Sequence, residues 1–255
     1  TYMITIFLVI YVLWRVLNNH KVLEPIKNKF KALWLFVLTG ILSAGSTAMI
    51  ILPTVYQLSL GKATHNTEIS FGFKFNILDL IPKLLPGSMT IKEIQDYGHA
   101  NIYVPFLILI LMFVFFINKR ISRSIKLSTG LIFGWLLWAT SWNPGILIMH
   151  AMQNPVWYNA RFTFITVFFA IFIAAYALKE SNIFDNSTYD KKITVFTYIV
   201  ISIITLYTIA ANILVKNPQA FVKGIPVLII IAILNWKYIM KYNKKGAYLV
   251  TVGML

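Results

Sequence analysis

The sequence predicts an all-α fold, a polytopic bundle of transmembrane helices with a long extracytoplasmic loop that contains a short interfacial helix. The first observation is composition: 58% of the 255 residues are hydrophobic and 12% are charged, whereas a soluble domain carries about 25% charged residues. The second is that the apolar residues gather in runs of the length that crosses a bilayer. The third is that basic residues alternate between rich and poor connections along the chain.

Seven apolar segments follow one another, and an eighth begins near the end of the chain. Most approach the roughly 17–25 residues that a helix needs to cross ~30 Å of hydrocarbon. The fourth is short, so it either extends through Trp142 toward Ile148 or is partly re-entrant. We expect one transmembrane domain over 1–255, an internal piece of a longer protein without a signal peptide. The segments lie at about 1–17, 32–52, 103–118, 129–142, 161–178, 193–215 and 225–240, with the start of another at 247.

Basic residues predict the orientation of these segments. Alternate connections carry 16 of the 23 lysines and arginines, and the remaining connections carry 7. Since basic connections stay in the cytoplasm, the loop at 53–102 is predicted to be extracytoplasmic. The net charge of +15 is explained by this pattern, so nucleic acid is not an expected partner. The absence of cysteine excludes disulfides, thiolate metal sites and cysteine nucleophiles.

The loop at 53–102 is the segment where we expect chemistry. It holds four of the eight acidic residues and two of the four histidines. Loops of about fifty residues are far longer than ordinary connections and are usually functional or disordered. Disorder is disfavoured because the loop is rich in phenylalanine, leucine and isoleucine that can be buried.

A short amphipathic helix is predicted at about 77–85 within this loop. Asn76 is a good N-cap, and Asp79 favours the positive end of the helix. Pro82 is expected to kink the helix, and Lys83 to lie opposite its apolar face. We expect this helix to lie along the outer membrane surface, with Leu80 or Ile81 turned toward lipid or the protein core.

Several polar residues near the outer ends of the segments have both a functional and a purely structural interpretation. His99 and Asn101 stand where the third segment begins, and Asp79 stands at a helix start; local capping is the favoured interpretation for all three. Arg161 opens the fifth segment after the connection at 143–160, which holds two Asn-Pro pairs and the aromatic residue Trp157. A guanidinium there suits a phosphate as well as a lipid headgroup.

Four motifs occur in order between residues 52 and 165: LPTVYQLSLGK, FKFNILDLIPKLLPGS, GHANIYVP and NPVWYNARFTFI. Together they resemble the YfhO family of bacterial polytopic membrane proteins. The resemblance implies a multi-pass glycosyltransferase of the GT-C type in the bacterial plasma membrane. Such an enzyme would move a sugar from an undecaprenyl-phosphate donor to a cell-envelope polymer such as teichoic acid. Its partners would be membrane lipid, the lipid-linked sugar and the teichoic acid acceptor.

The resemblance also implies a set of substrate-binding residues. GT-C enzymes resemble one another in an acidic catalytic motif in their first external loop, and we expect that loop to precede this chain. The catalytic base and any metal ligands are therefore unassigned, and a divalent metal cofactor is left open. The implied substrate-binding positions are Asp79, Lys83, His99, Asn101, Tyr103 and Arg161. The composition of the second external connection adds Trp157 as a candidate aromatic platform for the sugar.

Two other classes of function compete with the transferase. A transporter or flippase of lipid-linked sugars needs polar residues at mid-depth within its spans. Such residues are few here, and polar groups gather at the predicted outer face instead. A non-catalytic membrane subunit is left open by the sequence. Motifs of soluble enzymes, such as nucleotide-binding loops and zinc-binding HExxH, are absent.

Overall fold

The computed structural model describes residues 2–18, 26–60, 70–84, 98–153, 155 and 158–180, together with the single positions 195, 199, 202, 203 and 206. This part of the chain is helical, and its only β-type pairing is one isolated bridge. The predicted segments at 225–240 and from 247 lie outside the described residues, as does nearly all of the segment at 193–215.

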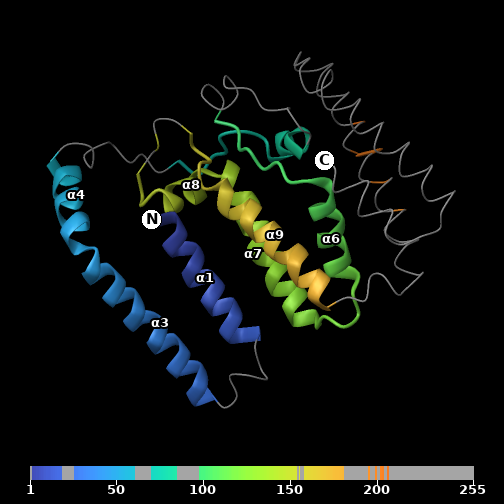
Figure 1. Cartoon of the computed structure of the whole chain (residues 1–255). Helices are drawn as coiled ribbons and strands as arrows, with labels where there is room; N and C mark the ends of the chain where they lie inside the picture. Colours follow the sequence, from blue (N-terminus) through green and yellow to red (C-terminus); the bar gives the residue numbers. More distant parts are fainter. Residues whose placement is uncertain are drawn as a thin grey trace.

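In Figure 1, α1, α6 and α9 run downward, whereas α7 and the consecutive pair α3 and α4 run upward. We call the end where α1, α6 and α9 begin the loop end, because the connections at 70–84, 98–105, 150–153 and 158–162 lie there; the other is the opposite end. The short helix α8 also lies at the loop end. The helices are α1 (Tyr2–Asn18), α3 (Ile26–Ser46), α4 (Ala48–Leu60), α6 (Phe106–Ile117), α7 (Arg123–Ser141), α8 (Asn143–Met149) and α9 (Thr163–Glu180).

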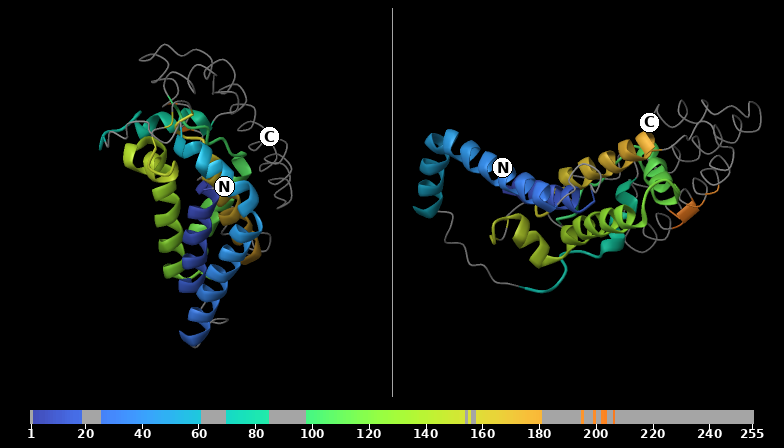
Figure 2. Two further views of the ribbon diagram at one scale, coloured as in Figure 1. Left: turned by 90° about the vertical axis from the view of Figure 1, so that its left-hand side faces the viewer. Right: turned by 90° about the horizontal axis from the view of Figure 1, so that it is seen from below.

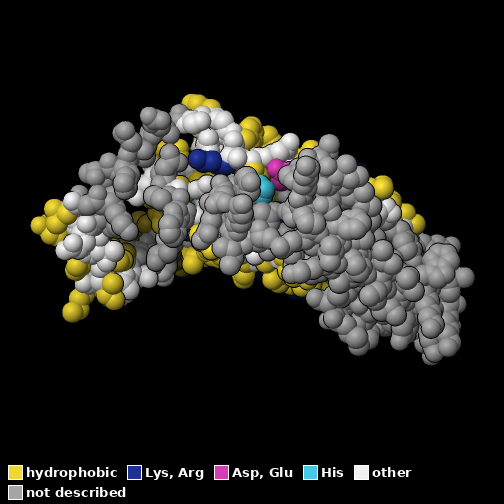
Figure 3. Space-filling view, turned by 90° about the horizontal axis from the view of Figure 1, so that it is seen from above, with side chains coloured by type: hydrophobic (Ala, Val, Ile, Leu, Met, Phe, Trp, Pro, Cys, Tyr) yellow, Lys and Arg dark blue, Asp and Glu magenta, His cyan; other side chains and the backbone are white. Residues whose placement is uncertain are grey.

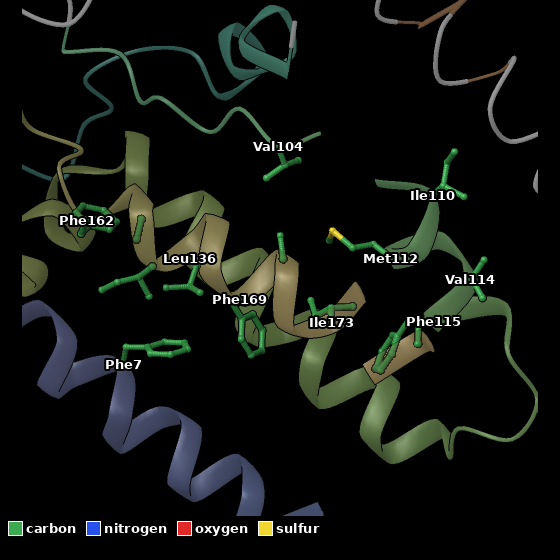
Figure 4. Packing of buried hydrophobic residues seen from close by; sticks show 14 of the residues in the cluster. Phe7, Val104, Ile110, Met112, Val114, Phe115, Leu136, Phe162, Phe169 and Ile173 are labelled. Atoms are coloured by element: carbon green, nitrogen blue, oxygen red, sulfur yellow. The ribbon is translucent and has the colours of Figure 1, made fainter. Parts of the chain in front are cut away.

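The core lies among α6, α7, α8 and α9. α6 packs most extensively against α9, and α7 packs against both α8 and α9. Leu136, Phe169 and Ile173 are almost completely buried between these helices (Figure 4). Close packing of this kind gains dispersion energy from many small contacts.

α1 joins this core through aromatic and polar side chains. Phe7 meets Phe169 edge to face at 5.7 Å, and Trp14 meets Phe172 at 5.5 Å. The indole Nε1 of Trp14 also donates a hydrogen bond of 3.1 Å to the buried hydroxyl of Thr129 on α7. The contacts fix α1 against α7 and α9, whereas α3 and α4 lie at the edge of the bundle, away from α6 (Figure 2).

One described helix, α9, is long and apolar enough by itself to cross a membrane. The pair formed by α3 and α4 passes the same test jointly, and α1 and α6 are shorter apolar helices. α1, α6, α7 and α9 begin and end within six residues of the predicted segments at 1–17, 103–118, 129–142 and 161–178. How many of these helices cross the membrane stays a prediction.

The second predicted segment differs from the structure. The sequence predicts one membrane-spanning segment at about 32–52 followed by a loop, but α3 begins at Ile26 and α4 extends to Leu60, inside the predicted loop. The two helices meet at a bend of 74°. The bend falls at Thr47, directly after Gly45 and Ser46, a small-residue pair of the kind that permits kinks, and not at Pro53 within α4.

The short fourth segment continues after a break. α7 ends at Ser141, Trp142 adopts an extended conformation, and α8 begins at Asn143 with Pro144 in its first turn. Proline fits the first turn of a helix because its missing N–H would have no intrahelical partner there. The helical path thus reaches Ile148 only after a break at Trp142, and both alternatives for the fourth segment, extension toward Ile148 and a partly re-entrant course, stay predictions.

The predicted helix at 77–85 is two 3₁₀ turns, η2 (Ile77–Leu80) and η3 (Pro82–Leu84). Asn76 caps the first turn as predicted, its side-chain oxygen accepting from the N–H of Leu78 at 3.0 Å. The N–H of Ile81 bonds to the carbonyl of Leu78 at 3.0 Å. Pro82 has no N–H with which to continue an α-helical ladder, so the segment keeps the tighter 3₁₀ form.

The predicted position of Lys83 is wrong. The sequence places it opposite the apolar face, but its side chain is only 5% exposed. Leu80 is buried too, while Ile81 and Leu84 pack on the main core. Three residues per turn, in place of 3.6, rotate Lys83 toward the bundle. The turns therefore rest on the protein; their position at a membrane surface stays a prediction.

Candidate functional site at the loop end

Two distant connections are joined by backbone hydrogen bonds at the loop end. The N–H of Lys74 donates to the carbonyl of Ser141 at 2.8 Å, and the N–H of Asn143 donates to the carbonyl of Gly72 at 3.1 Å. Between them, Phe73 and Trp142 form the isolated antiparallel bridge. The connection before α6 is thus fastened to the connection between α7 and α8.

A small apolar cluster holds a third segment against the first two. It brings together the 70–84 connection, the chain entering α6 and the residue before Arg161. Burying these side chains fixes the backbone of their polar neighbours in sequence. The candidates that directly adjoin a cluster residue are Asp79, His99, Asn101, Tyr103 and Arg161. The cluster consists of Phe75, Leu80, Ala100, Ile102 and Ala160.

His99 lies between this cluster and the surface. Its ring meets that of Phe75 edge to face at 5.1 Å, and its side chain is half-buried. Ala100, the next residue, is 1% exposed and belongs to the cluster. The imidazole is therefore held by packing, which is the support that a positioned binding group requires.

Asp79 and Lys83 are placed by the two 3₁₀ turns. Asp79 is half-buried on η2, and Lys83 is buried on η3. A lysine can bury its four-carbon stem while its ammonium group reaches polar surroundings. Asp79 is the only carboxylate that the described ranges place at the loop end, since Glu180 lies at the far end of α9.

Asn101 and Tyr103 shape the chain before α6. The side-chain oxygen of Asn101 accepts a hydrogen bond of 3.3 Å from the backbone N–H of Tyr103. This local bond is the kind by which asparagine mimics a backbone turn. Asn101 is exposed and Tyr103 is half-buried. This hydrogen bond supports the interpretation of Asn101 as a residue that caps the local backbone.

Arg161 is exposed at the start of α9. Its Nε donates to the carbonyl of Tyr158 at 3.3 Å, a bond that lays the side chain back along the preceding turn. The guanidinium end lies at the surface, where it can reach an anion or solvent. Trp157, the predicted sugar platform, lies outside the described residues.

His150, at the end of α8, is a candidate that the sequence reasoning missed. Its Nδ1 lies 2.8 Å from the carbonyl of Ile146, so in the neutral ring Nδ1 carries the proton and Nε2 is an acceptor. Burial, together with the positive charge of Arg161, lowers the pKa of His150, and the bond to Ile146 opposes this only partly. His150 is therefore neutral at pH 7. Its Nε2 is buried without a hydrogen-bond partner among the described residues.

The backbone around His150 is strained. Ala151, Met152 and Tyr158 adopt positive φ angles of 55°, 61° and 54°. Non-glycine residues in this conformation cost about 1–3 kcal/mol each and cluster at functional sites. The signal in the sequence that could have identified His150 is its place between two Asn-Pro pairs and before Arg161.

The predicted site residues thus share one end of the bundle. His99 and Asp79 lie with the first connection, and Arg161 lies beside His150 with the second; the shared apolar cluster joins the two groups. The face seen from above shows acidic and histidine side chains adjoining, with basic side chains nearby (Figure 3). A single pocket shared by Arg161 and His99 stays a prediction. Within the described ranges, no three histidine or acidic side chains are grouped to hold a metal.

The surface of the bundle is compatible with insertion into a membrane. Large apolar side chains on the bundle's surface are exposed, among them Phe30 at 69% and Trp34 at 65% on α3, whereas charged residues of the described helices lie near their ends. The family model described as "Bacterial membrane protein YfhO" matches residues 1–255, so the chain belongs to this family. A comparison with curated proteins and another with solved structures each gave no match.

Proposed function

We propose that this protein is an extracytoplasmic glycosyltransferase of the GT-C type, a multi-pass protein of the bacterial plasma membrane. It would move a sugar from an undecaprenyl-phosphate donor to a cell-envelope polymer such as teichoic acid. The observation that carries the proposal is the convergence of two connections at one end of an apolar bundle, which gathers Asp79, Lys83, His99 and Arg161 there. Membership of the YfhO family supports the same class.

In the proposed sugar transfer these residues have different roles. A hydroxyl of the acceptor attacks the anomeric carbon, the bond from that carbon to the phosphate oxygen breaks, and the electron pair leaves with undecaprenyl phosphate. Cations stabilise the charge that develops on the departing phosphate, which suits Arg161 and Lys83. Asp79 and His99 suit hydrogen bonds to sugar hydroxyls. The acceptor's proton passes to a base that we do not assign.

A transporter of lipid-linked sugars is supported less well by the described helices. Transport sites use polar or ionisable residues at mid-depth between spans. In α1, α3, α7 and α9 the charged residues lie in the first two turns or in the last turn, as Arg15, Lys31, Arg123 and Lys179 illustrate, and α6 has none. This distribution favours chemistry at a surface over passage through the bundle.

The decisive experiment compares two lysines of the same connection. Lys83 is buried beneath the proposed site, while Lys74 is exposed beside it. Full-length protein in liposomes would be given a panel of radiolabelled undecaprenyl-phosphate hexoses and teichoic acid, with and without EDTA. We expect Lys83→Met to lower kcat/KM at least tenfold, since a tenfold loss is about 1.4 kcal/mol of transition-state stabilisation.

The control and the alternatives give distinct results. Lys74→Met should stay within about twofold of the unmodified protein, because a surface charge away from the phosphate contributes little. Full transfer by a folded Lys83→Met protein would refute its role. Movement of the labelled lipid across the bilayer without sugar transfer would replace the transferase with a flippase, and neither activity would indicate a non-catalytic subunit.

A further inference from the structure

A cavity of about 250 Å³ lies directly beneath the 3₁₀ turns that carry Asp79 and Lys83. η2 and η3 form its roof through residues such as Leu80 and Leu84. α6, α7 and α9 form its walls, with Met112, Leu137 and Ala170 among the lining residues. Val104 and Met112, both lining residues, point toward the space beside α9 in Figure 4. The cavity is partly open, so a ligand can enter it.

The lining selects an apolar occupant. Twelve of the thirteen lining side chains are apolar, and Thr166 is the exception. A buried water needs two to four polar partners, which a single hydroxyl does not supply. An apolar cavity of about 150 Å³ holds benzene, with six carbons, so this one has room for about ten carbons on the same scale.

Thr166 favours an unsaturated hydrocarbon chain over a saturated one as the ligand. Its side chain is 2% exposed, and its Oγ1 is buried without a hydrogen-bond partner among the described residues. A saturated acyl chain offers this hydroxyl nothing, whereas the carbon–carbon double bond of an isoprene unit presents π electrons to which a hydroxyl can donate weakly. Ten carbons correspond to two five-carbon isoprene units.

The position of the two 3₁₀ turns over the cavity determines how a ligand's hydrocarbon chain is oriented in it. The same turns carry Leu80 and Leu84 on the cavity side and hold Asp79 and Lys83 in the candidate site. A ligand with its apolar part in the cavity would therefore have its polar end close to these residues. We propose that the cavity binds the first two isoprene units of a polyprenyl phosphate, counted from the phosphate. This inference rests on the proposed function, because it takes the lipid-linked donor as its occupant.

Photolabelling of the full-length protein in lipid nanodiscs tests the site. The probe is geranylgeranyl phosphate with a diazirine on its second isoprene unit. We expect it to label peptides of α6 and α9, and unlabelled undecaprenyl phosphate to compete while phosphatidylglycerol does not. Ala170→Leu fills the cavity and should reduce labelling at least tenfold. Ile171→Phe is the matched control, because Ile171 lies next to Ala170 but is 45% exposed, and labelling should stay within about twofold.

A second variant, Thr166→Val, tests the proposal even if Ala170→Leu does not fold. Thr166→Val keeps the shape of the side chain and removes its hydroxyl. It should reduce labelling by the unsaturated probe about threefold and leave labelling by a saturated phytanyl analogue unchanged. Unchanged labelling in Ala170→Leu, or in Thr166→Val where Ala170→Leu does not fold, overturns the proposal. Equal competition by phosphatidylglycerol also overturns it and identifies an ordinary lipid site.

The outcomes separate this inference from the function on which it rests. Specific labelling of α6 and α9 in a protein that transfers no sugar would keep the isoprenoid site and reject the transferase. Sugar transfer without labelling of these helices would keep the transferase and reject the cavity as the place of the chain.

Discussion

Gly98 lies directly against Asn159, and this contact is where the chain entering α6 meets the connection before α9. A Cβ atom at position 98 would lie 2.6 Å from Nδ2 of Asn159, and Gly98 has a φ of +66°. Only glycine satisfies both conditions without strain. His99 follows Gly98, and Arg161 follows Asn159 by two residues, so the packing of Gly98 sets the separation of two candidate site residues.

Gly98→Ala should therefore destabilise the loop end by about 1–3 kcal/mol, the cost of a non-glycine residue at a positive φ, with the clash added. Thermal unfolding of the purified protein measures the loss. Gly134→Ala is the matched control: Gly134 lies inside α7, and a Cβ added there would have no neighbour within 4 Å, so alanine should be neutral or stabilising by about 0.5–1 kcal/mol. Equal unfolding temperatures for the two variants would contradict this account of Gly98.

The bond between Trp14 and Thr129 is the second feature to test. Trp14→Phe keeps the ring against Phe172 but removes the donor to the buried Thr129 hydroxyl. We expect a loss of about 1–3 kcal/mol in the free energy of unfolding, the usual cost of leaving one buried partner unsatisfied. Denaturant unfolding in detergent provides the measurement.

A double-mutant cycle separates the hydrogen bond from the change in ring size. Thr129→Val removes the acceptor, and the pair Trp14→Phe with Thr129→Val removes both groups. The coupling energy should be close to 0.6 kcal/mol, about the average for side-chain hydrogen bonds within membranes. A coupling energy of zero would mean that Trp14 stabilises α1 through ring packing alone.

The helices themselves were predictable because apolar run length is a strong local signal. The Asn76 cap was predictable because it too depends on local sequence: it joins residues two positions apart. The bend at Thr47 was not, because a small-residue pair permits a kink without requiring one.

The site was predictable only in part. The sequence places His99 and Arg161 at the outer ends of segments and Asp79 in the long loop, and the connections that carry all three meet at one end of the bundle. The burial of Lys83 depends on the change from an α to a 3₁₀ turn, which propensity does not reveal. His150 was missed because its environment depends on Arg161 and Ile146, and the approach of Arg161 is set by the folding of a strained loop.

Sidedness in the membrane follows from the basic residues and has a direct test. These 255 residues contain no cysteine, so a single cysteine introduced among them is the only thiol that this part of the protein offers for labelling. Ser70 is exposed at the loop end, and Ser122 is exposed at the turn between α6 and α7 at the opposite end. A membrane-impermeant maleimide added to intact cells should label Ser70→Cys, and should label Ser122→Cys only after permeabilisation. Labelling of both from one side would contradict the assignment of the loop end as extracytoplasmic.

The last prediction concerns pH and His150. Its pKa lies below the ordinary value of 6.5 because of burial first and Arg161 second. Below pH 6.5 the unfolded chain therefore binds a proton that the folded chain binds less readily, so acidification favours unfolding. His150→Gln removes this group and should make the unfolding temperature fall less steeply between pH 7 and pH 5. Above pH 7.5 the unfolding temperatures of the two proteins should depend on pH in the same way, because position 150 is then neutral in both the folded and the unfolded state. Arg161→Gln should also flatten the curve, though less, because its charge is the smaller cause. A steeper fall in His150→Gln would show that protonated His150 stabilises the fold, and would remove its assignment as a neutral acceptor at the loop end.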